Sequence, residues 1–233
     1  MDIKVLASSS RANAYHISDG TTALLLDAGL SYKELQRALG FKTTELTAAL
    51  ITHEHKDHSR AVADLAKAGI NCYMSAGTKE ALGLSGHRIQ ELWPRVQTQI
   101  GTWTVLPFET QHDAAEPLGY LLASGKEKLL FATDTYYIRY KFNELTHIMI
   151  ECNYAADILE ENVEAERIPA ALKQRLLQSH FSLANVKEFL RANDLGKVEE
   201  IHLLHLSDGN SDEARFKREI QELTGRVVMV AGK

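Results

Sequence analysis

Cysteines and long apolar runs are both scarce in this chain of 233 residues. Cys72 and Cys152 are the only two cysteines, too few for a disulfide framework and not spaced as a metal-binding pair. We therefore expect two buried free thiols and a reducing compartment. No segment approaches the roughly 18 apolar residues of a membrane span, and the first residues lack a basic start followed by an apolar segment. The sequence thus predicts a soluble, cytoplasmic protein with no membrane partner.

Positive charge is in deficit as well. The chain has 26 Lys and Arg against 31 Asp and Glu, a net charge of -5, and a pI of about 6.1. Proteins that are held on nucleic acid by their whole surface have the opposite balance. A nucleic-acid partner would therefore have to be held locally, by a few side chains.

Apolar runs alternate with segments of helical period along the whole chain, without repeats or low-complexity tracts. The runs predict strands at 3–7, 22–28, 49–53, 70–74, 102–108, 118–123, 128–134, 147–152, 201–206 and 227–231. Helices are predicted at 31–39, 59–69, 77–84, 183–193 and 211–223, with Gly69 and Gly225 as stops. This alternation indicates a single α/β domain over residues 1–233. Residues 154–180 form a helical excursion, with Pro169 suited to the first turn of its second helix.

The densest chemistry lies in residues 53–58, HEHKDH. His53 and His55 are two apart at the end of a predicted strand and should point the same way, while Asp57 and His58 fall in the turn that starts the next helix. Imidazole suits zinc, carboxylate suits harder ions, and a mixed set at a strand end leaves positions for water. The pattern favours a catalytic metal site over its alternative, a solvated histidine-rich loop.

The HEHKDH motif is the signature of the metallo-β-lactamase superfamily, and the resemblance extends well beyond it. Asp27 closes the strand in TALLLDAG, His112 follows a strand in ETQHDAAEPLGY, Asp134 follows one in LLFATDTYY, and His205 ends the run IHLLHL. These blocks occur in the family order over residues 27–205. The chain therefore resembles a member of this superfamily over most of its length.

The resemblance implies a four-layer αββα sandwich that binds two divalent metal ions at one rim, zinc first and manganese second. The implied ligands of the first ion are His53, His55 and His112, and those of the second are Asp57, His58 and His205. Asp134 would bridge the ions, and Asp27 would orient the ligand loop from behind. Two alternatives stay open: Asp27 as an ordinary turn residue, and His202 in place of His205.

Four further blocks are similar to one branch of the superfamily, the YycJ/VicX-like (WalJ-type) single-domain hydrolases related to RNase J and tRNase Z. These blocks are SSSRANAY, HDAAEPLGY, IECNY and SHFSLANV. Members of the branch are regarded as nucleic-acid phosphodiesterases, in particular DNA exonucleases. The chain departs from the branch at Arg11 and Ala12, and by one extra residue in HFSLAN, which concerns the substrate pocket rather than the metal ligands.

Two divalent ions, two carboxylates and a shared hydroxide would leave the site with a net charge of about +1, which attracts an anionic ester. A bridging hydroxide would then be the nucleophile for a phosphodiester. The sequence therefore predicts a phosphodiesterase, a DNA exonuclease before an RNA-cleaving one, with Asp57, Asp134 and His180 as catalytic residues. His180 would hold or protonate a phosphate oxygen, or merely precede a helix. The alternatives are hydrolysis of a small phosphodiester or lactone, and a non-catalytic metal sensor.

Candidate substrate-binding residues cluster in three segments that flank the metal blocks. They are Ser9, Ser10, Asn13, Arg139, Lys141, Arg175, Ser182 and Asn185. Ser182 and Asn185 could equally cap a helix, the serines could form a polar turn, and the basic residues could be solvated surface charges. Tyr136, Tyr137 and Tyr140 interleave with the basic pair and offer surfaces for base stacking. Residues 154–180 should shape the entrance, and a homo-oligomer stays open.

Overall fold

A computed structural model describes residues 1–231, which divide into two compact units. Unit 1 comprises residues 1–109 and 114–126, and unit 2 comprises residues 110–113 and 127–231. Strands and helices alternate in both units, so the predicted α/β class is confirmed. The prediction of a single domain stays a prediction.

Unit 1 contains a six-stranded sheet in which the strands follow one another in chain order. The strands are β1 (Asp2–Ser9), β2 (Ala12–Ser18), β3 (Ala23–Leu26), β4 (Leu46–Leu50), β5 (Asn71–Met74) and β6 (Ile89–Glu91). β1, β2 and β3 pair antiparallel, whereas β3 to β6 run parallel. Because parallel strands end at the same edge, the residues that follow β3 and β4 come together there.

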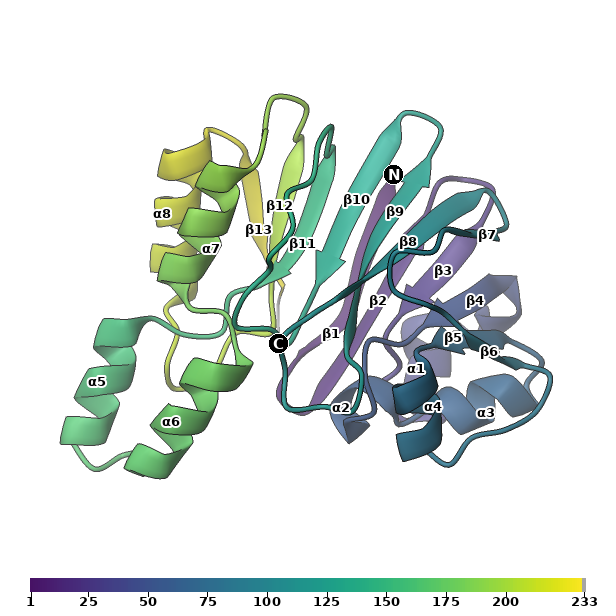
Figure 1. Ribbon diagram of the computed structural model, residues 1–233, viewed down its shortest axis with the longest axis horizontal. Helices are drawn as coiled ribbons and strands as arrows, with labels where there is room; N and C mark the ends of the chain where they lie inside the picture. The colour runs from purple at the N-terminus through teal and green to yellow at the C-terminus, as the bar shows by residue number, and fades with distance from the viewer. Residues whose placement is uncertain (232–233) are drawn as a thin grey trace. The chain divides into compact units, whose positions relative to one another are not determined.

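Short helices and a three-stranded ribbon complete unit 1 (Figure 1). The helices are α1 (Tyr32–Ala38), η1 (Thr43–Glu45), α2 (Lys56–Ser59), α3 (Val62–Lys67) and α4 (Ala76–Ala81). Apolar side chains from α1 and α3, such as Leu35 and Leu65, are buried with strand residues in one core. The antiparallel ribbon consists of β7 (Thr98–Ile100), β8 (Trp103–Glu109) and β9 (Leu118–Ser124). It is fixed beside the end of β4 because the Leu118 N–H donates to the Thr52 carbonyl at 2.9 Å.

Unit 2 is built on four parallel strands in the order β10, β11, β12, β13. They span Glu127–Ala132, His147–Glu151, Glu200–Leu204 and Val227–Val230. The helices are α5 (Ala156–Glu164), α6 (Ala170–Ser179), α7 (Leu183–Ala192) and α8 (Glu213–Thr224). Figure 1 shows α8 beside β13, α7 beside α8, and α5 beside α6. The strand ends again gather polar residues, since Asp134 and His205 follow β10 and β12, and Glu151 ends β11.

Several predicted elements differ from the observed ones. The strand predicted to reach His53 ends at Leu50, and the helix predicted at 59–69 is the shorter α3, which is divided from the preceding α2 at residues 60–61. The division arises because the backbone at His58 and Ala61 bonds to Ala28 instead of continuing a helix: Ala28 N–H donates to His58 O at 2.7 Å, and Ala61 N–H donates to Ala28 O at 2.9 Å. Strands β2, β6 and β7 were not predicted.

The helical excursion at 154–180 is confirmed as α5 and α6, with Pro169 as the N-cap of α6 rather than in its first turn. Gly225 ends α8 in a left-handed conformation, as predicted for a helix stop. Both cysteines are buried free thiols. Among residues 1–231, no helix combines the length and the apolar character that a membrane crossing requires.

Candidate metal-binding clusters

The HEHKDH motif brings its four metal-ligand candidates together within unit 1. His53 Nε2 lies 3.1 Å from His55 Nδ1, and the rings of His53 and His58 lie 4.2 Å apart. Asp57 Oδ2 lies 3.2 Å from His58 Nε2. His53 and His58 are buried, whereas Asp57 is partly exposed. Three imidazoles and one carboxylate thus converge just beyond the end of β4.

Asp27 lies behind two of these histidines and is completely buried. Its Oδ2 accepts from His58 Nδ1 at 2.8 Å, and its Oδ1 accepts from the Thr52 hydroxyl at 2.9 Å. Because the Thr52 hydroxyl is thereby committed as a donor, it accepts from His53 Nδ1, also at 2.9 Å. Both histidines therefore carry their proton on Nδ1 and present the Nε2 lone pair, the form that binds a metal ion. Burial raises the pKa of the Asp27 carboxyl, although His58 and Thr52 act to lower it.

Asn13 supports the same cluster from strand β2. Its buried amide nitrogen lies 3.0 Å from His58 Nε2 and 3.3 Å from Asp57 Oδ2, and its Oδ1 accepts from the Tyr15 hydroxyl. The sequence pattern suggested a substrate contact for Asn13, and the structure places its amide against two ligand candidates. The neighbouring Ser9 and Ser10 lie at the tight turn between β1 and β2, where the Ser9 hydroxyl accepts from the Arg11 N–H.

Replacing Asp27 by asparagine should weaken metal binding about 10- to 100-fold, the range typical for groups that orient metal-bound histidines. The amide keeps the size of the carboxylate but loses the charge that fixes His58 and, through Thr52, His53. Zinc affinity is measured by competition with a chromophoric chelator. Asp64→Asn, at an exposed carboxylate in α3, is the control. Equal affinities of the Asp27 variant and the wild type would contradict this role.

Unit 2 carries a second cluster that contains His112, Asp134, Glu151, His180 and His205. His205 Nδ1 lies 2.8 Å from Asp134 Oδ1, and His112 Nε2 lies 3.5 Å from Asp134 Oδ2. The His180 ring lies 5.4 Å from the His205 ring and 5.5 Å from the His112 ring. The last four of these residues offer donor atoms that all lie within 4.8 Å of one another.

His205, and not its competitor His202, is the histidine that joins this cluster. His202 lies inside strand β12, and its Nε2 contacts Glu200 at 3.1 Å. The structure thus places His205, and not His202, beside Asp134, and the choice of His205 as a metal ligand stays a prediction.

Glu151 is the centre of the second cluster, although the sequence pattern assigned it no role. Its Oε1 accepts from His180 Nδ1 at 2.6 Å and from His205 Nδ1 at 3.0 Å. Its Oε2 accepts from the backbone N–H groups of Thr135 and Phe181 at 3.0 and 3.1 Å. The available signal was an acid at the end of β11, whose five residues HIMIE are all buried. A buried carboxylate requires such partners, because an unpaired one would be very unfavourable.

The charges within this cluster shift three pKa values. Burial acts to raise the pKa of Glu151, but His180 and His205 outweigh it and lower the pKa. Burial acts to lower the pKa of His180, but Glu151 and Asp134 raise it. His205 is affected in the same way, and Asp134 and Glu151 raise its pKa to about 10. The carboxylates thus favour protonated imidazoles until a cation takes the place of the protons.

The end of helix α6 fixes His112. The Ser179 carbonyl, at the last residue of α6, accepts from His112 Nδ1 at 3.0 Å, which leaves Nε2 directed toward Asp134. Burial lowers the pKa of His112, although the negative charge of Asp134 acts to raise it. The end of the helical excursion therefore holds His112 with its Nε2 toward Asp134, and burial favours the neutral imidazole.

Three candidate residues have a left-handed backbone, which is uncommon for residues other than glycine. The φ angles are 56° for Asp27, 48° for Asp134 and 51° for His205, and each of these residues closely follows the end of a strand. Such conformations are retained where the side chain must point in one particular direction, and they cluster at functional sites.

The remaining candidates divide into exposed and internally bonded side chains. Arg139 and Lys141 are exposed on the segment after Asp134, and Arg175 pairs with Asp113 at 3.2 Å. The Ser182 hydroxyl accepts from the Asn185 N–H and so caps α7, the alternative that its sequence left open. The Asn185 side chain donates to the Tyr136 carbonyl at 3.1 Å.

The donor chemistry of both clusters fits divalent metal ions. Imidazole nitrogens dominate, carboxylates supplement them, and outer acceptors such as Asp27, Glu151 and the Ser179 carbonyl fix the rings. This combination is typical of zinc and related ions in catalytic sites, and the outer partners are characteristic of metal centres rather than of surface histidines.

Comparison with known proteins gives a consistent result. The Beta-lactamase superfamily domain matches residues 22–205. The chain is 30% identical to the exodeoxyribonuclease WalJ of Streptococcus pneumoniae over 224 residues, which cover 89% of this chain and 82% of that protein. It is 30% identical to the exodeoxyribonuclease YycJ of Bacillus anthracis over 235 residues, with 91% and 85% covered. Among solved structures, the metallo-β-lactamase fold protein YhfI of Bacillus subtilis aligns with a TM-score of 0.75 at 17% identity and covers 98% of this chain and 95% of its own.

Proposed function

Because this chain belongs to the β-lactamase superfamily, with its metallo-β-lactamase fold, we propose that it is a dinuclear metal-dependent phosphodiesterase that removes nucleotides from the ends of nucleic acid. The chain is an enzyme, a metal-dependent hydrolase of that family. Support for a nucleic-acid substrate comes from the two exodeoxyribonuclease relatives, which also favour DNA over RNA. The observation that carries the proposal is the Glu151–His180 pair beside Asp134 and His205, since it supplies a proton donor next to ligand candidates.

We assign the metal ligands as the resemblance implies, with zinc as the first candidate and manganese as the second. One ion would be held by His53, His55 and His112, the other by Asp57, His58 and His205, and Asp134 would be shared. The hydrogen bonds that fix Nδ1 of His53 and of His58, and so direct both Nε2 atoms toward the other ligand candidates, support this assignment. When bound, such a pair of ions supplies an activated water and positive charge for an anionic phosphodiester.

The residues of the chain itself perform the proton transfer. Glu151 fixes the ring of His180 through Nδ1 and stabilises its protonated form, so that Nε2 carries a proton that can be given to the departing oxygen. Asp27, Thr52 and Asn13 hold the unit 1 ligands in place. Arg139, Lys141 and Arg175 are proposed contacts to the phosphates of the polymer. The proposed compartment is the cytoplasm, where buried thiols stay reduced.

The test is a panel of labelled single-stranded and duplex DNA and RNA, with either end blocked and with zinc or manganese added. Release of mononucleotides from one end, abolished by chelation, is the expected result. Polymer that stays intact with every metal would overturn the proposal. Turnover of bis(p-nitrophenyl) phosphate, a cyclic nucleotide or a lactone alone would assign the protein to small esters.

Glu151→Gln should shift the alkaline limb of the kcat–pH profile to lower pH. Glu151 raises the pKa of His180, so a proton donor at this position is active below that pKa and is lost as the pH rises through it. Removing the negative charge lowers the pKa, and activity is therefore lost earlier on the alkaline side. Glu200→Gln removes the carboxylate of another Glu–His pair, that with His202, and is the matched control. An alkaline limb that does not move in the Glu151 variant would exclude His180 as the acid.

A further inference from the structure

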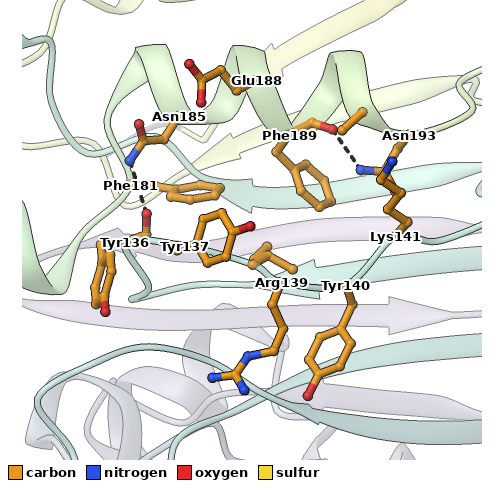
Figure 2. Close-up of a pocket in the computed structure, with 12 residues that line it drawn as sticks. Tyr136, Tyr137, Arg139, Tyr140, Lys141, Phe181, Asn185, Glu188, Phe189 and Asn193 are labelled. Carbon is orange, nitrogen blue, oxygen red and sulfur yellow. Dashed lines mark hydrogen bonds between the residues drawn. The ribbon is translucent and has the colours of Figure 1, made fainter.

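A cavity of about 340 Å³ lies within unit 2, between residues 136–141 and helix α7 (Figure 2). Its lining includes Tyr137, Arg139, Lys141, Phe181 and Phe189. This volume is at the lower end of the roughly 300–1,000 Å³ typical of small-ligand pockets. The cavity is thus of a size for one planar ring system with its immediate substituents.

Aromatic rings form the walls of this cavity. Figure 2 shows the rings of Tyr137, Phe181 and Phe189 among the residues that line the cavity, with Phe189 on α7. The rings of Phe181 and Phe189 lie 6.4 Å apart, and both are buried. Tyr137 is 55% exposed, so about half of its surface is accessible to a ligand. Aromatic faces of this kind bind bases of any sequence.

Arg139, Lys141 and the carboxylate of Glu188 all line the cavity, and no ion pair joins these residues of the described chain. Neither the Arg139 nor the Lys141 side chain takes part in an ion pair with any residue of the described chain, 1–231, and both are exposed. Several other cations of this chain, whose net charge is -5, do pair with carboxylates. Such pairs involve Lys79, Lys173, Lys197 and Arg215. In Figure 2 the Arg139 guanidinium extends away from α7, where it can contact a phosphate rather than a ring in the cavity.

Both walls of the cavity are anchored on the carboxylate that holds His180. The Thr135 and Phe181 N–H groups donate to the same Oε2 of Glu151. Thr135 directly precedes the wall formed by residues 136–141, and Phe181 begins the wall on the α7 side. The Asn185 amide then joins α7 to the Tyr136 carbonyl at 3.1 Å. The lining of the cavity therefore includes Phe181, the residue that directly follows the proposed proton donor His180.

We propose that this cavity receives one unpaired base of the polynucleotide, stacked on Tyr137, while Arg139 and Lys141 contact the adjoining phosphates. The inference rests on the proposed function and adds to it a preference for single-stranded or frayed ends. A paired base has its hydrogen-bonding edge occupied by a partner strand, and the small volume of the cavity leaves no space for that partner. A duplex end must therefore open before its base enters.

The test combines a protein change with a substrate change. Single-stranded oligonucleotides that carry one abasic nucleotide at successive positions from the end are cleaved by the wild type and by Tyr137→Ala. For the wild type, one position should show a loss in kcat/KM of roughly 5- to 140-fold, the range expected for one stacked base. Tyr137→Ala should show a similar loss on the intact strand and no additional loss at that position. Tyr137→Phe, which keeps the ring, should restore the wild-type pattern.

Trp93→Ala is the matched control, because Trp93 is 56% exposed and lies outside the cavity lining. Its abasic profile should equal that of the wild type. If the loss in kcat/KM caused by Tyr137→Ala and the loss caused by the abasic site multiply in the combined experiment, the inference is overturned. The nuclease assignment is left intact by that result. A wild type that releases no nucleotide from any polymer would instead remove the proposed function, and this inference with it.

Discussion

Asp134→Ala is expected to lower kcat/KM for both DNA and bis(p-nitrophenyl) phosphate by at least about a thousandfold, because the proposed ligands act together and the loss of one disables the set. The substitution removes the carboxylate that contacts His205 at 2.8 Å and faces His112 at 3.5 Å. Because Asp134 is proposed to be shared by both ions, elemental analysis of the purified variant should show fewer than two metal ions per chain.

The control for this experiment is Asp157→Ala, which removes an exposed carboxylate of the same unit that pairs with Arg215. It should keep both the metal content and the rate. An Asp134 variant that retains two ions and wild-type turnover would disprove the proposed ligand set. A wild type that binds two ions and never turns over any ester would favour the metal-sensor alternative.

Gly29→Ala is expected to destabilise the protein by about 3 kcal/mol or more, the upper range for overpacking, and to lower Tm by roughly 6–12 °C. A Cβ atom on Gly29 would lie 1.6 Å from the Asp57 carbonyl oxygen and 2.7 Å from the Asn13 nitrogen. Both contacts are backbone atoms, so no side-chain rotation relieves the clash. Since Asp57 must shift, metal affinity should fall together with stability, and thermal unfolding and chelator competition measure the two effects.

Gly209→Ala is the matched control for the same substitution. The added Cβ there meets nothing within 4 Å, and the backbone is not left-handed. Its Tm should stay constant or rise slightly, because alanine restricts the unfolded chain more than glycine does. Equal Tm values for the Gly29 and Gly209 variants would show that Asp57 does not depend on this close approach.

The parts of the site that could be predicted from the sequence are those encoded within a few residues. The HEHKDH block places His53, His55, Asp57 and His58 together whatever the rest of the chain does, and the structure brings them together in unit 1. Buried parallel strands were predictable for a related reason, since a continuous apolar run such as that of β11 is typical of a strand that is covered on both faces.

The parts that could not be predicted depend on contacts between distant segments. The break between α2 and α3 arises from backbone bonds to Ala28, some thirty residues earlier, which no local propensity encodes. The position of Asn13 beside His58 depends on the pairing of β2. Polar residues in β2 interrupt the apolar pattern that would have predicted a strand there. Glu151 was visible as a residue in IECNY, but its role emerges only when Thr135, His180 and Phe181 surround it.

The carbonyl at the end of α6 constrains how the α5–α6 hairpin can be re-engineered. From sequence, residues 154–180 shape an entrance, which suggests removing them to separate polymer from small-ester cleavage. The Ser179 carbonyl, however, holds His112, and His180 is the next residue. The hairpin can therefore be exchanged between homologues only at its outer turns. Chimaeras that truncate the final turn of α6 should have a misaligned His112 rather than a new specificity.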